Sequence, residues 1–134
     1  MTAQPVQLVH EEITRSIISA FFFVFNKLRF GFLESVYAAA LTKVLRSRGH
    51  IVEREVRVRV WFEGEAIAIQ RIDMLIDKKV IVEIKCGDRL ALNAREQLHN
   101  YLRATGLEVG LLLHFGPKPA FIRQFNPVVT QLRD

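Results

Sequence analysis

QRIDMLI at residues 70–76, DKK at residues 77–79 and VIVEIK at residues 80–85 form the stretch that decides the fold. The two outer segments alternate in polarity, and the polar residues between them predict the turn of a hairpin. In an antiparallel hairpin, paired residues have numbers with a constant sum, so a turn centred on Lys78 sets Ile76 opposite Val80 and Asp73 opposite Glu83. Two carboxylates are therefore expected to lie side by side.

This register sorts the side chains of the hairpin onto two faces, because side chains alternate along a strand. One face is expected to be core and consists of Ile72, Met74, Ile76, Val80, Val82 and Ile84. The other face is expected to carry the charges of Arg71, Asp73, Glu83 and Lys85. A shift of one residue would bury a carboxylate among aliphatic side chains, so the pattern favours this register.

Opposed carboxylates repel each other when their Cβ atoms are about 5 Å apart. A divalent cation with oxygen ligands is the usual neutraliser, and carboxylates suit Mg²⁺ or Mn²⁺. The hairpin therefore predicts a cation site at Asp73 and Glu83. The alternative is that Arg71, Asp73, Glu83 and Lys85 form a salt-bridged, solvent-exposed face of a sheet.

Length and charge limit the remaining possibilities. The 134 residues fit one domain, residues 1–134. The net charge of +5 suggests a polyanionic partner, which composition alone does not separate from an acidic protein or a membrane surface. The single cysteine, Cys86, excludes an internal disulfide and fits a reducing, cytoplasmic location. We expect its thiol to be buried and structural. The apolar run at residues 17–25 is shorter than the roughly 20 residues that span a membrane, so no membrane association is expected.

Hydrophobic periodicity predicts two helices before the hairpin. A first apolar set at helical spacing consists of Ile13, Ile17, Phe21, Phe25 and Leu28, and a second occupies residues 33–45, with Gly49 as its stop signal. Both helices are expected to pack on the same sheet. Phe21, Phe22, Phe23 and Phe25 point in more directions than one apolar stripe covers. At least one should remain exposed, and we expect a homodimer, or a partner, to cover this Phe-rich helix.

The remaining elements are strands and one further helix. Alternation over residues 51–62 predicts a strand whose outer side carries Arg57 and Arg59, and Gly64 marks the turn into the strand of Asp73. Residues 91–104 are expected to be helical, followed by an apolar strand at 109–115 and a possible strand at 120–125. A helix between the third and fourth strands allows a parallel crossover, so a mixed α/β sheet is expected.

Five ordered motifs resemble the PD-(D/E)XK nuclease superfamily. They include Asp73 followed by Glu83-x-Lys85 on a strand, GFLESVY at residues 31–37, and QLHNY at residues 97–101. GFLESVY matches the signature of one branch, the GxxExxY proteins, and QLHNY matches the QxxxY motif of nucleases like the RecB and lambda exonuclease group. The remaining motifs are Arg71-x-Asp73 and the stretch from Tyr101 to Gly116. The resemblance covers about residues 10–125 and implies an αβββαβ core with an extra N-terminal helix.

The resemblance also implies roles for single residues. Asp73, Glu83 and the main-chain carbonyl of Ile84 would bind Mg²⁺ or Mn²⁺, with Glu34 as a third acidic group near the metal. Lys85 would assist the attacking water. A last set, expected to hold the phosphate and order the site, consists of Arg71, Gln97 and Tyr101.

Several of these residues have simpler interpretations. Glu34 also suits a helix N-terminus, where a negative charge is favourable. Tyr37 lies on the apolar stripe of its helix and is expected in the core. Gln97 and Tyr101 would share a helix face in any case, because they are four residues apart. Arg57 and Arg59 are interpreted as a solvated strand face, with phosphate contact as the alternative. The four histidines lack the short spacing of a zinc site and are expected to be structural or at the surface.

Two functions from different classes follow. The first is an Mg²⁺-dependent nuclease that cleaves nucleic acid, expected to be DNA, with RNA as an alternative. The second is a non-catalytic nucleic-acid-binding or accessory module that keeps the nuclease fold. A third possibility is a phosphate-containing substrate other than nucleic acid. The joint presence of Asp73, Glu83 and Lys85 favours the enzyme, because a binding protein has no need for opposed carboxylates.

Overall fold

The computed structural model describes residues 8–126. Its elements follow the predicted order, with the additional last strand: α1 (Glu11–Leu28), α2 (Glu34–Ser47), β1 (Val52–Phe62), β2 (Glu65–Ile76), β3 (Val80–Cys86), α3 (Ala94–Thr105), β4 (Val109–Phe115) and β5 (Pro119–Phe125). The strands form one sheet in the order β1-β2-β3-β4-β5. Strands β3 and β4 are parallel and the other neighbours are antiparallel. The predicted α/β class with a mixed sheet is confirmed.

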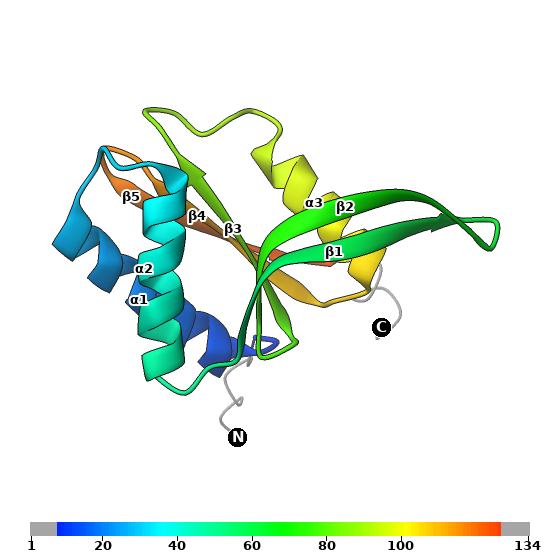
Figure 1. Cartoon of the computed structure of the whole chain (residues 1–134), viewed down its shortest axis with the longest axis horizontal. Coiled ribbons are helices and arrows are strands. Elements are labelled where there is room, and N and C mark those ends of the chain that lie inside the picture. Colours follow the sequence, from blue (N-terminus) through cyan, green and yellow to red (C-terminus); the bar gives the residue numbers. More distant parts are fainter. Residues whose placement is uncertain (1–7, 127–134) are drawn as a thin grey trace, which may run out of the picture.

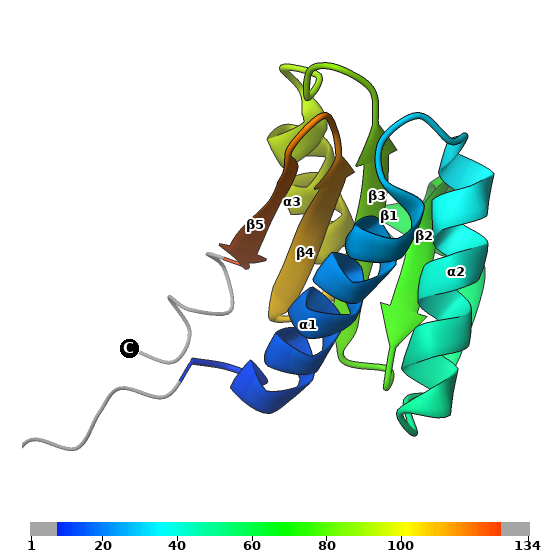
Figure 2. The same ribbon diagram turned by 90° about the vertical axis from the view of Figure 1, so that its left-hand side faces the viewer.

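Helices cover both faces of the sheet. Helices α1 and α2 lie on one face and α3 lies on the other (Figure 2). Under α1 and α2, a first cluster contains Ile17, Phe21 and Tyr37 from the helices together with Met74 and Phe115 from the sheet. Under α3, a second cluster contains, among others, Ile72, Ile81, Leu98, Tyr101 and Leu112. The expectation that the first two helices pack on the same sheet is confirmed.

The register predicted for the β2–β3 hairpin is confirmed, since Ile76 pairs with Val80 and Met74 with Val82. The division into one apolar face and one charged face was wrong in part. Leu75 packs in the α3 cluster, and Ile72 lies in that cluster as well, although Met74 lies in the other. Regular alternation cannot place Ile72 and Leu75 on one side. The facing of β2 therefore changes around Asp73, where β2 stops pairing with β3 and continues with β1 alone.

Beyond that point β1 and β2 continue as a two-stranded ribbon that projects from the body of the molecule (Figure 1). We call residues 56–62 and 65–71 the β1–β2 arm. Its turn residues Glu63 and Gly64 have φ values of 50° and 79°, the left-handed pair typical of a tight hairpin turn. The β1–β2 register shifts by one residue between Val60 and Trp61. This bulge leaves Ile67 without a paired residue and changes which residues lie opposite one another from Val60 to the base of the arm.

The Phe-rich helix α1 distributes its aromatic residues as predicted. Phe21 and Phe25 are buried, Phe22 is half-buried and Phe23 is 46% exposed. Lys27 and Arg48 lie over the ring of Phe23, 5.7 and 5.8 Å from its centroid. Within residues 8–126, no helix is long and apolar enough to cross a membrane.

Candidate functional site

Two hydrogen bonds from main-chain amides to carboxylates mark the place where β2 and β3 separate. The amide of Asp73 donates to Glu83 Oε1 at 3.0 Å, and the amide of Ile84 donates to Asp73 Oδ2 at 2.8 Å. The two carboxylates take up amide groups that strand pairing no longer satisfies. We call this place, formed by Asp73, Glu83 and Ile84, the β2–β3 fork. The structure therefore brings Asp73 and Glu83 together, as the hairpin register predicted.

Glu83 is an unusually buried carboxylic acid, with only 3% of its surface exposed. Burial raises its pKa to about 8, and the negative charge of Asp73 acts in the same direction, while the amide of Asp73 and the charge of Lys85 act against it. Within the described chain, no ion pair joins Glu83 or Asp73 to Lys85 or Arg71. A salt-bridged, solvent-exposed face therefore does not describe these residues.

Lys85 lies two residues after Glu83 on β3 and contacts a side chain of α3. Its Nζ donates to Gln97 Oε1 at 2.8 Å. Tyr101, one turn further along α3, is buried. Burial raises its pKa, the charges of Glu83 and Asp73 raise it further, and a hydrogen bond with Gln97 opposes them. The predicted helical pair Gln97 and Tyr101 therefore lies beside the fork rather than on an ordinary solvent-exposed helix face.

Glu34 approaches the fork from the other side of the sheet. With Asp73, Ile84, Arg54 and Glu55 it lines a cavity of about 130 Å³. The residue is exposed overall, yet partial burial raises the pKa of its carboxyl group, the charge of Asp73 raises it further, and Lys85 lowers it. Glu34 is the first residue of α2, so the structure agrees with both the helix N-terminal interpretation and a place near the fork.

Tyr37 holds the loop that leads into α2. Its ring stacks on Phe115 with the centroids 4.1 Å apart, its hydroxyl donates to the carbonyl of Arg29, and the amide of Phe32 donates to that hydroxyl at 3.3 Å. The prediction that Tyr37 belongs to the core is confirmed. Tyr37 thereby ties the α1–α2 loop, which precedes Glu34 at the start of α2, to the core.

One expected residue is not brought to the fork, and others there were not expected. Arg71 is exposed on the β1–β2 arm opposite Arg57, and no described hydrogen bond or ion pair joins it to Asp73, Glu83 or Lys85. Glu55, by contrast, lies at the register position opposite Asp73 and has a left-handed φ of 53°. Glu55 and Arg54 both line the Glu34 cavity, and the sequence offered only an alternating strand at this point.

The fork suits a cation that needs few protein ligands. Among residues 8–126, no three His, Cys, Asp or Glu side chains lie close enough together to hold a metal ion by themselves. Mg²⁺ is commonly bound by only one or two carboxylates and keeps several water molecules as its other ligands. The two carboxylates of Asp73 and Glu83 are therefore enough protein ligands for this ion. The hydrogen bonds described above use one oxygen of each carboxylate. The raised pKa of Glu83 reflects burial and repulsion that a bound cation would offset.

Cys86 follows Lys85 at the end of β3. It is half-buried and packs against the first cluster. Burial raises the pKa of its thiol to about 11, and the charges of Glu34 and Asp73 contribute. The thiol is therefore protonated at neutral pH and a poor nucleophile, in agreement with the predicted structural role.

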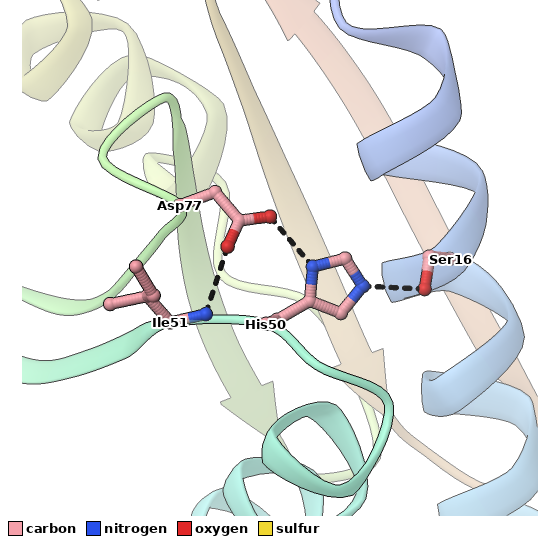
Figure 3. A network of polar contacts seen from close by, with 4 residues as sticks. All are labelled: Ser16, His50, Ile51 and Asp77. Atoms are coloured by element: carbon pink, nitrogen blue, oxygen red, sulfur yellow. Dashed lines mark hydrogen bonds and ion pairs between the residues drawn. The ribbon is translucent and has the colours of Figure 1, made fainter.

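A second polar cluster lies at the β2–β3 turn and contains Ser16, His50 and Asp77 (Figure 3). The hydroxyl of Ser16 and His50 Nε2 are 2.7 Å apart, as are His50 Nδ1 and Asp77 Oδ2, while the amide of Ile51 donates to Asp77 Oδ1 at 2.8 Å. Ser16 lies inside the regular helix α1, and both oxygens of Asp77 are used to hold the α2–β1 loop. Asp77 also has a left-handed φ of 53°. The cluster therefore fastens a strained turn to α1, and the expectation of a structural histidine holds for His50.

Comparisons with known proteins agree with this geometry. The sequence profile of the PD-(D/E)XK nuclease superfamily matches residues 11–124. No curated protein is significantly similar to the chain in sequence. Among solved structures, the crystal structure of SSO0001 resembles the chain with a TM-score of 0.59 and 21% sequence identity. The match covers 92% of this chain and 64% of that one, so the chain spans 64% of the length of SSO0001. This likeness indicates a shared fold.

Proposed function

The chain belongs to the PD-(D/E)XK nuclease superfamily, and from this premise we propose that it hydrolyses phosphodiester bonds of nucleic acid with a divalent cation bound at the β2–β3 fork. One observation carries the proposal. The buried carboxylate of Glu83 lies against Asp73 without an ion-pair partner among the described residues, and Lys85 is held two residues away. Ionisation of Glu83 in this buried place beside Asp73 is costly, which raises its pKa, and a cation bound to both carboxylates would offset that cost.

The side chains at and beside the fork would have separate roles in hydrolysis. Bound at Asp73 and Glu83, Mg²⁺ or Mn²⁺ would supply Lewis-acid activation of water and charge neutralisation at the phosphate. An ammonium group has three donors, and the bond to Gln97 uses one, so Lys85 retains donors for a water molecule or a phosphate oxygen. Tyr101, whose raised pKa keeps its hydroxyl protonated, would donate to the phosphate or order Gln97.

Three further roles belong to the same proposal. The carbonyl of Ile84 would complete the protein ligands, since Ile84 lines the same cavity as Asp73 and Glu34. Glu34 would act on the metal directly or through water. Arg71 would contact a phosphate beyond the scissile one, because its exposed position on the arm is two residues from Asp73. The positive net charge of +5 favours a polyanion as substrate, and we propose DNA.

Within the superfamily we propose the GxxExxY branch. Gly31, Glu34 and Tyr37 occupy the signature positions, and each has a distinct task in the structure. Gly31 has a φ of 124°, which side chains other than glycine rarely adopt, so it allows the loop to turn into α2. Tyr37 ties that loop to the core and Glu34 faces the fork cavity.

A cleavage assay tests the proposed activity. Single- and double-stranded DNA and RNA are incubated with the chain in Mg²⁺, in Mn²⁺ and in EDTA. Lys85→Met keeps the aliphatic stem and removes the ammonium, so cleavage should fall by at least about a hundredfold, the lower end for such assistance. Lys79→Met, at the opposite end of β3 in the exposed β2–β3 turn, is the matched control and should cleave normally. Equal activity in all three proteins would return Lys85 to a structural role.

The same assay tests the alternative function, a non-catalytic module that binds nucleic acid. Binding of nucleic acid by the wild type, without metal-dependent cleavage of any of the four substrates, would favour it.

We also propose that a homodimer forms through α1. The exposed Phe23 borders an apolar cavity of about 310 Å³ between α1 and α2, which Val24, Leu28, Ala40 and Val44 also line. Exposed apolar surface of this kind commonly marks an interface. Light scattering coupled to gel filtration should give twice the mass of the chain, and Phe23→Ser should give the monomer. Leu92→Ser, which alters another exposed apolar residue, should leave the dimer intact.

A further inference from the structure

We infer that the groove between the β1–β2 arm and α3 holds a single-stranded segment of nucleic acid, with one base stacked on Trp61. The inference rests on the proposed function, because the groove leads to the β2–β3 fork. The fork alone specifies neither the surface that the nucleic acid occupies nor whether the nucleic acid is single- or double-stranded.

The groove consists of two cavities that share residues. The larger, about 450 Å³, is lined by Trp61, Gln70, Asn100 and Arg103 among others. The next, about 250 Å³, is lined by Gln70 and Asn100 again and by Gln97 and Tyr101. Because Gln70 and Asn100 belong to both, the cavities are adjacent. Because Gln97 binds Lys85, the second cavity opens beside the fork.

The lining has the chemistry of base recognition. Gln70, Asn100 and Gln97 carry amide groups, each with donors and an acceptor for base edges. Oε1 of Gln70 is buried and has no hydrogen-bond partner in the described part of the chain, although the residue lines both cavities. Arg103 supplies a charge at the outer end, and Glu96 carries the opposite charge in the inner cavity.

Trp61 is an exposed aromatic ring at the rim of this groove, with 59% of its surface accessible. The neighbouring residues Val60 and Trp61 both line the larger cavity, next to the place where the β1–β2 register shifts. A flat, exposed ring stacks on any base that is free of its pairing partner. A paired base offers only its edge in a groove of the duplex, so the arrangement favours a single strand.

The arm also carries positive charge on the face that points away from α3, outside the groove itself. Val56 and Val58 pack in the α3 cluster, so Arg57 and Arg59 between them point away from α3 and are exposed. Arg71 lies opposite Arg57 on the neighbouring strand. Three arginines on one narrow ribbon attract a polyanion to the arm.

The spacing sets the length of the segment. Six residues separate Glu55, at the level of the fork, from Trp61, which corresponds to about 20 Å of strand at about 3.3 Å per residue. Trp61 would therefore contact a base that lies about 20 Å along the groove from the scissile phosphate.

Trp61 is the sole tryptophan of the chain, so its fluorescence reports on the proposed contact directly. The wild type is titrated in EDTA, where no metal-dependent cleavage occurs, with an oligothymidylate longer than the 20 Å span. Stacking should quench the emission, and a blunt duplex of the same length should leave it unchanged. Cleavage without quenching would overturn the inference alone, whereas quenching without cleavage would overturn the proposed function alone.

Anisotropy of a labelled oligothymidylate then measures the contribution of the ring. Trp61→Ala should weaken binding about 5- to 150-fold, the range for loss of one stacked base, and Trp61→Phe should restore most of it. Phe62→Ala is the matched control, because Phe62 is equally exposed on the same hairpin but does not line the groove. An equal loss in Phe62→Ala would overturn the inference. So would Trp61 emission that changes on dilution without oligonucleotide, since a second copy would then cover the ring.

Discussion

Glu83 and Asp77 are both carboxylates at the ends of the β2–β3 hairpin, yet their surroundings act on them in opposite directions. Glu83 is buried beside another carboxylate, which raises its pKa to about 8. Burial by itself would raise the pKa of Asp77 as well. Hydrogen bonds from His50 and from the amide of Ile51 outweigh this effect, so the pKa of Asp77 is lowered. Ionised Glu83 therefore destabilises the metal-free fold, whereas ionised Asp77 stabilises it.

Glu83→Gln should stabilise the metal-free protein at pH 8. Between pH 4.5 and 8 the unfolded chain releases the proton of Glu83 while the folded chain keeps it, so wild-type stability falls as pH rises through this window. Glutamine has no such titration and still accepts a hydrogen bond from Asp73. Denaturant titrations in EDTA should show a gain on the order of a few kcal/mol at pH 8 that disappears near pH 4. Glu65→Gln, an exposed carboxylate on β2, should show no such dependence.

Asp77→Asn should destabilise the fold without affecting cleavage. The substitution removes a charged acceptor of two hydrogen bonds, a loss of about 1.5 to 3 kcal/mol. Because the folded pKa of Asp77 is lowered, its stabilisation is present above the ordinary value of 3.8 and is lost as pH falls through the folded value. Thermal melts should therefore separate wild type and variant at pH 7 and bring them together in acid. Loss of cleavage at unchanged stability would contradict the structural role.

At the scale of elements, α3 connects the second cluster to the fork. It buries Leu98 and Leu102 and presents Gln97 to Lys85 from the same helix. The close approach of α3 to β4 depends on Gly110, where a Cβ atom would lie 2.7 Å from Leu98 Cδ1 and 3.4 Å from the carbonyl oxygen of Ile81. Leu98 is fully buried, so its side chain cannot turn into solvent. The position of Gln97, the partner of Lys85, therefore depends on a glycine in β4, the strand next to β3.

Gly110→Ala should displace α3 and destabilise the fold by about 1 to 3 kcal/mol, the usual cost of overpacking. Cleavage should fall at temperatures where the variant is still folded, because Gln97 moves away from Lys85. Introduced into Leu98→Ala, the same change should cost less, since the colliding side chain is gone. Equal costs in the two backgrounds, measured by denaturant titration, would show that Leu98 is not the obstacle.

At the scale of the whole molecule, the sheet divides at the fork into a body covered by helices and the projecting β1–β2 arm (Figure 1). The fork joins Asp73 of β2 to Glu83 of β3, so a cation there would link the two strands, and Glu34 of α2 lines the adjoining cavity. A ligand that binds only the folded state stabilises it by mass action. Metal binding should thus be visible in the stability of the entire fold.

Mn²⁺ at a hundred times its dissociation constant should stabilise the protein by about 2.7 kcal/mol. Thermal melts with and without Mn²⁺ measure the effect, and the double variant Asp73→Asn/Glu83→Gln should show no shift. No shift in the wild type, or an equal shift in the double variant, would count against a cation at the fork.

Local rules in the sequence determined the order of the elements and the pairing of the β2–β3 hairpin. The alternation of apolar side chains and the DKK turn act over neighbouring residues, which is why Ile76 opposite Val80 could be predicted and why Asp73 and Glu83 were expected to meet. The same holds for the helical spacing of Gln97 and Tyr101, which depends only on the turn of one helix.

Tertiary structure alone decided the form of the fork. A hairpin centred on Glu63 and Gly64 sets Phe62 opposite Glu65, a register that would place Arg54 opposite Asp73, but the bulge after Val60 shifts it by one and places Glu55 there instead. Packing against α3 turned Ile72 away from the face of Met74. The contact of Ser16, His50 and Asp77 joins three segments distant in sequence. Bulges, changes of facing and such contacts arise from the balance of long-range packing, which no periodicity within a short segment records.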